Sequence, residues 1–276
     1  MALKLMYITN RPDIAQIAES SGVDRIFVDM EYIGKAQRQG GLDSVQNHHT
    51  VEDVRAMKQA VQTAEVLVRI NPIHDAAAEY TSSKEEIDEV IRAGADILML
   101  PYITSVSQVK EFLDCVDGRA KTMLLIETPV SAESIDEILA HDGIDEIYIG
   151  LNDLSLGYHK KFMFELLADG TVEGLCLKCK LKGIPYGFGG IASLGKGMLP
   201  SEYIIREHYR LGSTCAILSR SFCNVEKVQH IGIISSTFID GVKAIRELEA
   251  ECESKISYFR TNERVVAERV QLICEG

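Results

Sequence analysis

Eight short apolar runs, separated by stretches of helical character, constrain the fold of this chain more than any other feature. Each run is continuously apolar rather than alternating, the pattern of a parallel strand that is covered on both faces. The candidate strands are LKLMYIT (3–9), RIFVDM (25–30), EVLVRI (65–70), ILMLPY (97–102), TMLLIET (122–128), EIYIGL (146–151), YGFGGI (186–191) and CAILSR (215–220). Helix-like segments lie between them at 12–21, 51–64, 84–93, 105–116, 131–140, 160–182 and 201–211.

Eight strands that alternate with helices can form a closed (β/α)₈ barrel or an open doubly wound sheet. An open sheet of the dinucleotide-binding kind usually carries a G-x-G-x-x-G turn after its first strand, but here that turn reads TNRPD. We therefore predict an α/β fold of the TIM-barrel type, with the barrel core over residues 1–224.

Helix boundaries are marked by capping residues. Thr50 and Ser131 supply oxygen acceptors where the free amides of a helix N-terminus need them. Gly94, Gly183 and Gly212 end three helices at positions where a left-handed C-cap is expected.

Residues 225–276 are longer than a barrel needs. They begin with a helix-like run that would close the barrel and continue as SKISYFRTNERVVAERVQLICEG, in which Phe259, Val266 and Val270 are apolar. We expect a C-terminal helical arm that serves oligomerisation. A helix packed on its own barrel is the alternative.

The net charge and the apolar content narrow the classes of molecule that this chain is expected to bind. The formal net charge is −12, and an acidic surface disfavours nucleic acid and anionic membranes. No apolar run approaches the ~20 residues that span a bilayer, and the first residues lack the pattern of a signal peptide, so we expect a cytoplasmic protein. The seven cysteines are then expected to be free thiols, and the lone C-x-x-C of Cys176 and Cys179 is weak evidence for zinc.

Two acids follow consecutive predicted strands, Glu127 after TMLLI and Asp153 after EIYIG. Catalytic groups of such barrels lie at the carboxyl ends of the strands, and neighbouring strands are about 4.8 Å apart, so both acids can reach one point. Two carboxylates this close either share a proton or share a cation. Oxygen ligands favour Mg²⁺ or Mn²⁺ over zinc. The alternative is that each acid simply caps the next helix.

Arg69 ends the apolar run VLVR, where a buried guanidinium needs an anionic partner. Together with a metal held by two carboxylates, it could bind a 2-oxo acid and stabilise the enolate formed from it. None of the candidate strands ends in lysine, which disfavours Schiff-base chemistry.

These positions carry a family resemblance. The segments VDMEY (28–32), VRINP (68–72), GADILMLPYITSVSQV (94–109), LLIETPVSAESIDEI (124–138) and IYIGLNDLSLG (147–157) resemble the HpcH/HpaI aldolase and citrate-lyase-β group. The two acid-bearing segments are the most specific, and G-x-N-D-L is also similar to the pyruvate-binding barrels of PEP-utilising enzymes.

The resemblance implies that Glu127 and Asp153 hold Mg²⁺ or Mn²⁺ and that Arg69 contacts pyruvate or oxaloacetate. It implies that the amides around Gly150, Leu151 and Asn152 hold the substrate carboxylate. It also implies a homo-oligomer, a trimer or hexamer, whose subunits exchange the C-terminal helix.

The chain departs from the family pattern in the second strand. Aldolases of the group carry D-x-E-H there, whereas this chain has Asp29-Met-Glu31-Tyr32, so Tyr32 replaces a histidine assigned to acid–base work. We keep Glu31 and Tyr32 as candidate substrate-binding residues.

The long loop over 31–50 offers substitutes for the missing histidine. His48 or His49 could supply the proton carrier, and the alternative is that both are ordinary loop residues. Lys35 and Arg38 are candidates to bind an anionic aldehyde, and solvated loop charges are the alternative.

We therefore expect a metal-dependent carbon–carbon lyase, a class II aldolase, that cleaves or joins a pyruvate-type 2-oxo acid and an unidentified aldehyde or acyl partner. A CoA-thioester lyase of the citrate-lyase-β type is a second possibility, although such proteins usually begin with an R-S-x-L-F-V-P-G-like strand and this one has LKLMYITN. A barrel that binds a 2-oxo acid without catalysis is a third.

Overall fold

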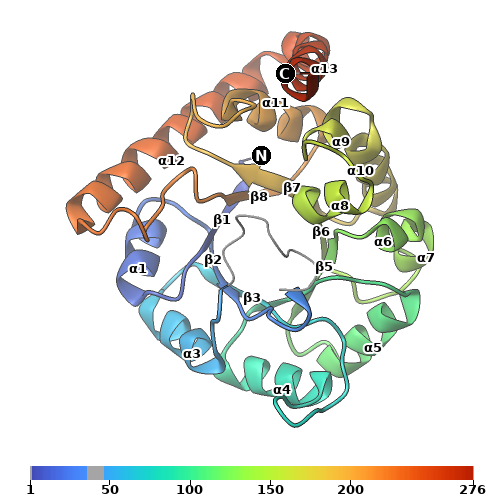
Figure 1. The fold of residues 1–276 in the computed structure, drawn as a ribbon. Coiled ribbons are helices and arrows are strands. Elements are labelled where there is room, and N and C mark those ends of the chain that lie inside the picture. Colours follow the sequence, from blue (N-terminus) through green and yellow to red (C-terminus); the bar gives the residue numbers. More distant parts are fainter. Residues whose placement is uncertain (1, 36–46, 276) are drawn as a thin grey trace.

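The computed structural model describes residues 2–35 and 47–275, and in it eight parallel strands close into a single barrel (Figure 1). The strands follow one another round the barrel in chain order, and β8 pairs with β1. The predicted TIM barrel is confirmed. The strands are β1 (Lys4–Ile8), β2 (Arg25–Asp29), β3 (Glu65–Arg69), β4 (Ile97–Leu100), β5 (Lys121–Ile126), β6 (Glu146–Ile149), β7 (Tyr186–Ile191) and β8 (Cys215–Leu218).

The pairing register decides which side chains meet at the barrel mouth. Strands β2 and β3 pair from Arg25 opposite Glu65 to Asp29 opposite Arg69. An acid and a base therefore lie side by side at the carboxyl ends of these strands, and an opposite-charge pair lies at their amino ends.

Large apolar side chains fill the barrel interior, among them Phe27, Met99 and Tyr148. The ring of Tyr148 occupies the space that Gly187 leaves on the next strand, since a Cβ at Gly187 would lie 2.8 Å from that ring and 2.3 Å from the carbonyl oxygen of Cys215. The Tyr148 hydroxyl donates to the Gly189 carbonyl and accepts from the Ile217 amide at 2.9 Å.

An ion-pair network closes the amino end of the barrel. Arg25 is completely buried, and its Nη1 and Nη2 donate to the two carboxylate oxygens of Glu146 at 2.8 and 2.5 Å. Its Nε donates to Glu65 at 2.9 Å, and Lys121 contacts the other oxygen of Glu65 at 2.5 Å. Each buried charge therefore has a partner, as burial in a low-dielectric interior requires.

The helices that surround the barrel follow the sequence prediction with three exceptions, the last of which is a helix over 151–157 that the sequence pattern did not predict. They are α1 (Pro12–Ser20), α3 (Val51–Ala60), α4 (Ser83–Ala93), α5 (Val106–Val116), α6 (Pro129–Glu133), α7 (Ile135–Ile138), α8 (Leu151–Gly157), α9 (Glu165–Ala168), α10 (Thr171–Lys182) and α11 (Ser201–Leu211). The Thr50 capping box is present, and Gly94, Gly183 and Gly212 are left-handed C-caps as predicted.

The first exception is the helix predicted to start at Ser131. Thr128 is the N-cap and accepts from the Ser131 amide, so Ser131 lies inside α6, and a turn at Ser134 separates α6 from α7. The second is the single helix predicted over 160–182. It is broken by Asp169 and Gly170, where Gly170 has a φ of 84°, and α10 starts only after it.

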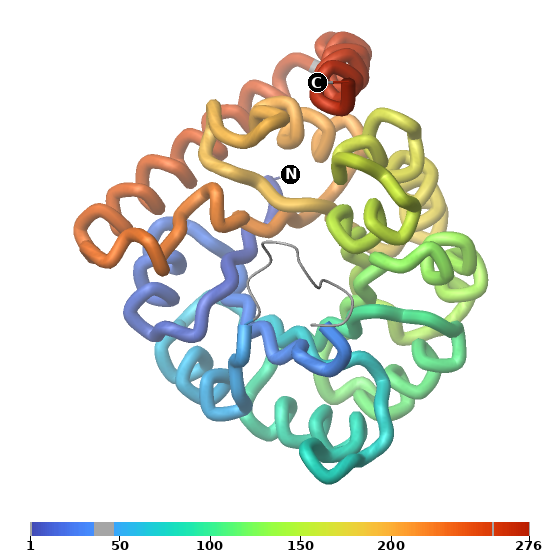
Figure 2. The backbone as a smooth tube through the Cα atoms, viewed as in Figure 1, coloured from blue at the N-terminus to red at the C-terminus, as the bar shows by residue number. Residues whose placement is uncertain are grey.

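The C-terminal segment packs on the barrel of its own chain. Helix α12 (Ile231–Ser254) lies along the outside of the barrel against α1 and α11, and α13 (Phe259–Glu275) follows the short turn η1 (Ile256–Tyr258) (Figure 2). Helix α13 lies against α9 and α11 and buries Val266 and Val270. Asn262 donates to Glu207 at 2.7 Å. An oligomer built through this arm remains a prediction.

All seven cysteines are free thiols, as predicted, and Cys176 and Cys179 lie on the buried side of α10. No helix within residues 2–35 and 47–275 combines the length and apolar content needed to cross a bilayer.

Candidate active site

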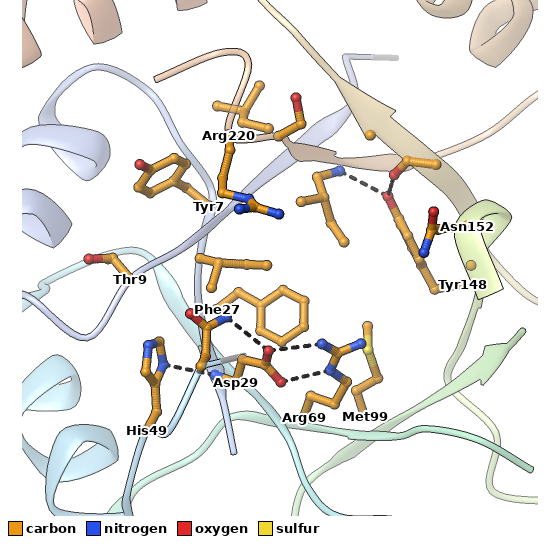
Figure 3. A pocket seen from close by; sticks show the side chains of 18 of the residues that line it. Tyr7, Thr9, Phe27, Asp29, His49, Arg69, Met99, Tyr148, Asn152 and Arg220 are labelled. Carbon is orange, nitrogen blue, oxygen red and sulfur yellow. Dashed lines mark hydrogen bonds and ion pairs between the residues drawn. The ribbon is translucent and has the colours of Figure 1, made fainter. Parts of the chain in front are cut away.

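A cavity of about 810 Å³ opens at the carboxyl ends of the strands (Figure 3). Its walls come from the ends of β1, β2, β3 and β5, from the start of α8, and from the turn after β8. This is the end of a TIM barrel at which catalytic groups are found.

Glu127 and Asp153 both line this cavity, as predicted from their places in the sequence. Glu127 directly follows β5 and is buried, and Asp153 lies in the first turn of α8. Burial raises the pKa of Glu127 to about 8; Arg69 opposes this rise, and the nearby charges of Glu31 and Asp153 add to it. The Tyr102 amide donates to Glu127 at 2.9 Å and favours the charged form. Two acids in such an environment either share a proton or share a cation.

Gly150 lets the backbone approach this acid closely. A Cβ at Gly150 would lie 2.8 Å from the Cβ of Glu127 and 3.1 Å from its Oε2. Gly150 is also the N-cap of α8, so the amides of Leu151 and Asn152 are among the helix amides without partners inside the helix. All three residues line the cavity, which agrees with their predicted role beside a substrate carboxylate.

Charge and ligand type both fit a divalent metal. The charges linked to Glu127 by ion pairs or electrostatic contact give, with Glu127 itself, four carboxylates and two cations, a formal charge of −2 for this group; they are Asp29, Glu31, Glu127, Asp153, Arg69 and Lys35. Oxygen-rich sites suit Mg²⁺ or Mn²⁺. Within the described part of the chain, no group of three or more His, Cys, Asp or Glu residues is placed to hold a metal. Glu127 and Asp153 would therefore share the ion with water and substrate.

Arg69 has a protein partner that the sequence argument did not assign. Its Nε and Nη2 donate to the two oxygens of Asp29 at 2.8 and 2.9 Å, and its Nη1 lies 3.4 Å from Glu31 (Figure 3). Burial alone would raise the pKa of Asp29, but Arg69 and Lys35 hold it well below its usual range. Asp29 is therefore the first anionic partner of Arg69, a place that the sequence argument gave to the substrate. Its two hydrogen bonds fix the plane of the Arg69 guanidinium at the cavity wall.

Lys35 and Glu31 are buried next to this pair, and Lys35 also lines the cavity. Lys35 is 4% exposed, and its Nζ lies 3.2 Å from Asp29 and 3.3 Å from Glu31. Its charge is already matched, so the structure does not support Lys35 as a binder of an anionic aldehyde. Glu31 is not part of the cavity wall, and it acts on the site through Lys35 and Arg69. Arg38 lies outside the described residues.

The two histidines occupy different environments. His49 lines the cavity, and its Nδ1 accepts from the Asp29 amide at 3.0 Å (Figure 3). Burial lowers the pKa of His49, so the ring is neutral and carries its proton on Nε2. His48 is exposed and is not part of the cavity wall.

Tyr32 also lies away from the cavity. Its side chain is 43% exposed, and its amide donates to Asn71 at 2.9 Å. The geometry therefore supports His49 and does not support His48 or Tyr32 as residues that meet a substrate.

Arg220 was missed by the sequence argument, although it stands in the predicted last strand, CAILSR. It follows β8 and lines the cavity together with Ser219. Applying the strand-end rule to β8, as was done for β5 and β6, would have found it.

Comparison with known proteins agrees with this fold. A model of the protein family described as HpcH/HpaI aldolase/citrate lyase matches residues 4–186. A curated relative, a (3S)-malyl-CoA thioesterase from Cereibacter sphaeroides, is 22% identical over 174 residues, which are 63% of this chain and 57% of that protein. This chain thus matches little more than half the length of that relative.

Two solved structures share the fold. An HpcH/HpaI aldolase from Desulfitobacterium hafniense is 18% identical, with a TM-score of 0.58 over 89% of this chain and 93% of that one. An HpcH/HpaI aldolase/citrate lyase family protein from Burkholderia cenocepacia is 14% identical, with a TM-score of 0.60 over 84% and 94%.

Proposed function

Since the chain belongs to the HpcH/HpaI aldolase/citrate lyase family, we propose that it is a divalent-metal-dependent carbon–carbon lyase that acts through the enolate of a 2-oxo acid. The observation that carries the proposal is the buried carboxylate of Glu127, which lines the cavity, is approached closely by Gly150 and lies within electrostatic reach of Asp153 and Arg69. A site at the mouth of this barrel with more carboxylates than cations suits a divalent metal, and the metal in turn suits an anionic substrate.

In the cleavage direction, a 4-hydroxy-2-oxo acid would lose its hydroxyl proton to solvent. The bond between C3 and C4 breaks, its electron pair forms the enolate, and C4 leaves as an aldehyde. The enolate then takes a proton from solvent at C3 and becomes the 2-oxo acid. A metal held by Glu127 and Asp153 would supply Lewis-acid polarisation of the keto oxygen.

The protein groups stabilise charge rather than carry protons. Arg69, held in plane by Asp29, lies where it can face the negative charge of the enolate. The amides that begin α8 face the substrate carboxylate. His49 can donate from Nε2 but cannot accept a proton there, because its Nδ1 is occupied by the Asp29 amide and its Nε2 already carries hydrogen. We therefore assign His49 the role of donating a hydrogen bond to the reacting oxygen, and not the role of a general base.

The test is a pair of matched variants. Glu127→Gln removes one metal ligand, and Glu137→Gln makes the same change at an exposed position of α7. With pyruvate and Mn²⁺ in D₂O, the Glu127 variant should lose both Mn²⁺ binding and methyl proton exchange, whereas the Glu137 variant should keep both. Exchange at the wild-type rate in the Glu127 variant would rule out the assignment.

The same assay separates the alternatives. No exchange in the wild type, with oxalate still bound, favours a non-catalytic 2-oxo acid binder. Cleavage or hydrolysis of a malyl-type CoA thioester favours the chemistry named in the curated relative.

A further inference from the structure

Helix α8 contains a glycine that its backbone does not require. Gly157 is the last residue of α8, and its φ does not lie in the left-handed region that favours glycine. Alanine would suit a helical position better, because glycine loses more backbone freedom when a helix forms. The reason for glycine at position 157 must therefore lie in what packs against it.

Pro129 fills the space beside Gly157. A Cβ at position 157 would lie 2.6 Å from Cδ and 2.8 Å from Cγ of Pro129, far inside the roughly 3.5–4.0 Å at which carbon atoms attract each other. A proline ring is closed onto its own backbone nitrogen, so it cannot swing aside as a long side chain does. Gly157 therefore lets α8 lie directly against the first residue of α6, and Figure 1 shows these two helices side by side.

Pro129 is held in place by its neighbour. Thr128 is buried and is the N-cap of α6, where its hydroxyl accepts from the Ser131 amide at 3.0 Å and donates to the Ile103 carbonyl at 2.5 Å. The Thr128 amide donates to the Ser131 hydroxyl at 3.2 Å. The first turn of α6 is therefore fixed by hydrogen bonds, and an added atom at position 157 would displace α8 instead.

The other end of α8 lies against the same segment of chain. Gly150, the N-cap, passes so close to Glu127 that a Cβ there would lie 2.8 Å from the Glu127 Cβ, and the Gly150 amide donates to the Ile126 carbonyl at 3.0 Å. Asp153 lies between the two glycines, in the first turn of α8. A displacement at Gly157 would therefore turn α8 about its fixed end and move Asp153 away from Glu127.

This displacement is large for a metal ligand. Restoring ordinary carbon contact at position 157 requires about 1 Å of movement, from 2.6 Å to roughly 3.6 Å. Asp153 lies three residues from Gly150 and Gly157 lies seven, so a rigid helix would move Asp153 by about 0.4 Å. Ligand distances in metal sites are held within about 0.2 Å.

We propose that Gly157 is a positioning residue for the candidate metal site. It lets α8 lie against Pro129 and thereby sets the separation between the carboxylates of Asp153 and Glu127, on which their affinity for a divalent ion depends. This inference rests on the proposed function, because it takes those two carboxylates as the metal ligands. Gly157 itself is not part of the cavity wall, so it acts on a bound ion only through α8.

The test measures the Mn²⁺ affinity of the full chain by electron paramagnetic resonance. Gly157→Ala should weaken binding about 10- to 100-fold, the usual range for residues that orient metal ligands. Gly174→Ala is the matched control, because it adds the same methyl group to a helical glycine of α10. There no described atom lies within 4 Å of the new Cβ, apart from chain neighbours and the backbone of α10 itself. This control should keep the affinity within about twofold.

Removing the proline ring should cancel the effect. Pro129→Ala deletes the Cγ and Cδ atoms that the new Cβ would meet, so in this background Gly157→Ala should weaken binding less than about threefold. Partial unfolding would instead lower the number of Mn²⁺ sites per chain and leave their affinity unchanged. Equal weakening in both backgrounds would refute the proposal. If Gly157→Ala alone fails to fold, the double variant should fold and bind Mn²⁺, and a double variant that stays unfolded counts against the proposal.

The outcomes separate this inference from the proposed function. If the wild type binds Mn²⁺ and Gly157→Ala binds it equally well, the role of Gly157 is refuted while the lyase proposal stands. If the wild type binds no Mn²⁺, the lyase proposal fails, and crystal structures of the two proteins decide the role of Gly157. The carboxylates of Asp153 and Glu127 should then lie roughly 0.4 Å farther apart in Gly157→Ala. An unchanged separation would overturn the inference.

Discussion

Replacing Arg25 tests the ion-pair network that closes the amino end of the barrel. Arg25→Met removes a completely buried guanidinium and keeps much of the side-chain volume. Glu146 would keep a carboxylate whose side chain is 9% exposed, without the described cation that now pairs with it, whereas Glu65 would keep Lys121. Breaking a buried pair by removing one partner costs about 3–5 kcal/mol of unfolding free energy.

Urea unfolding followed by circular dichroism measures this loss of unfolding free energy. A second substitution, Glu146→Leu in the Arg25→Met background, should recover most of the loss, because an apolar pair can replace a buried ion pair. Arg55→Met, which breaks an exposed pair with Glu52, is the matched control and should cost less than about 1 kcal/mol. A loss below about 1 kcal/mol for Arg25→Met would refute the reasoning.

Two further predictions concern the cavity. Gly150→Ala should weaken Mn²⁺ binding at least about tenfold, because the new Cβ would collide with Glu127 and move its carboxylate. Electron paramagnetic resonance measures the affinity, and an unchanged value would mean that the carboxylate can shift freely. His49→Ala should slow aldehyde addition at least about tenfold, whereas His48→Ala should change that rate by less than about twofold, since only His49 lines the cavity. Equal rates of the two variants in stopped assays would contradict the assignment.

The barrel and the positions of Glu127 and Asp153 at its mouth were predictable because their signals are local in the sequence. A continuously apolar run of four to eight residues marks a covered strand wherever it occurs, and an acid directly after such a run points to the barrel mouth. Glu127 and Asp153 needed no knowledge of contacts between distant segments.

What the sequence left open, and the one helix it predicted wrongly, depend on contacts that the sequence does not display. The partner of Arg69 follows from the β2–β3 register, which places Asp29 beside it. The choice between His48 and His49 depends on which ring the returning loop turns inward. The break at Gly170 lies in a segment whose helical propensity is otherwise continuous, so propensity alone predicted one helix.

The packing of Tyr148 against Gly187 has a consequence for altering this cavity. Tyr148 forms part of the cavity floor, and its hydroxyl bridges β7 and β8. Any side chain at position 187 displaces the tyrosine, and any smaller residue at position 148 deepens the floor but leaves the amide of Ile217 without its acceptor. The two positions therefore set the cavity depth jointly, and a library that varies them together should yield more stable variants of altered depth than one that varies either position alone.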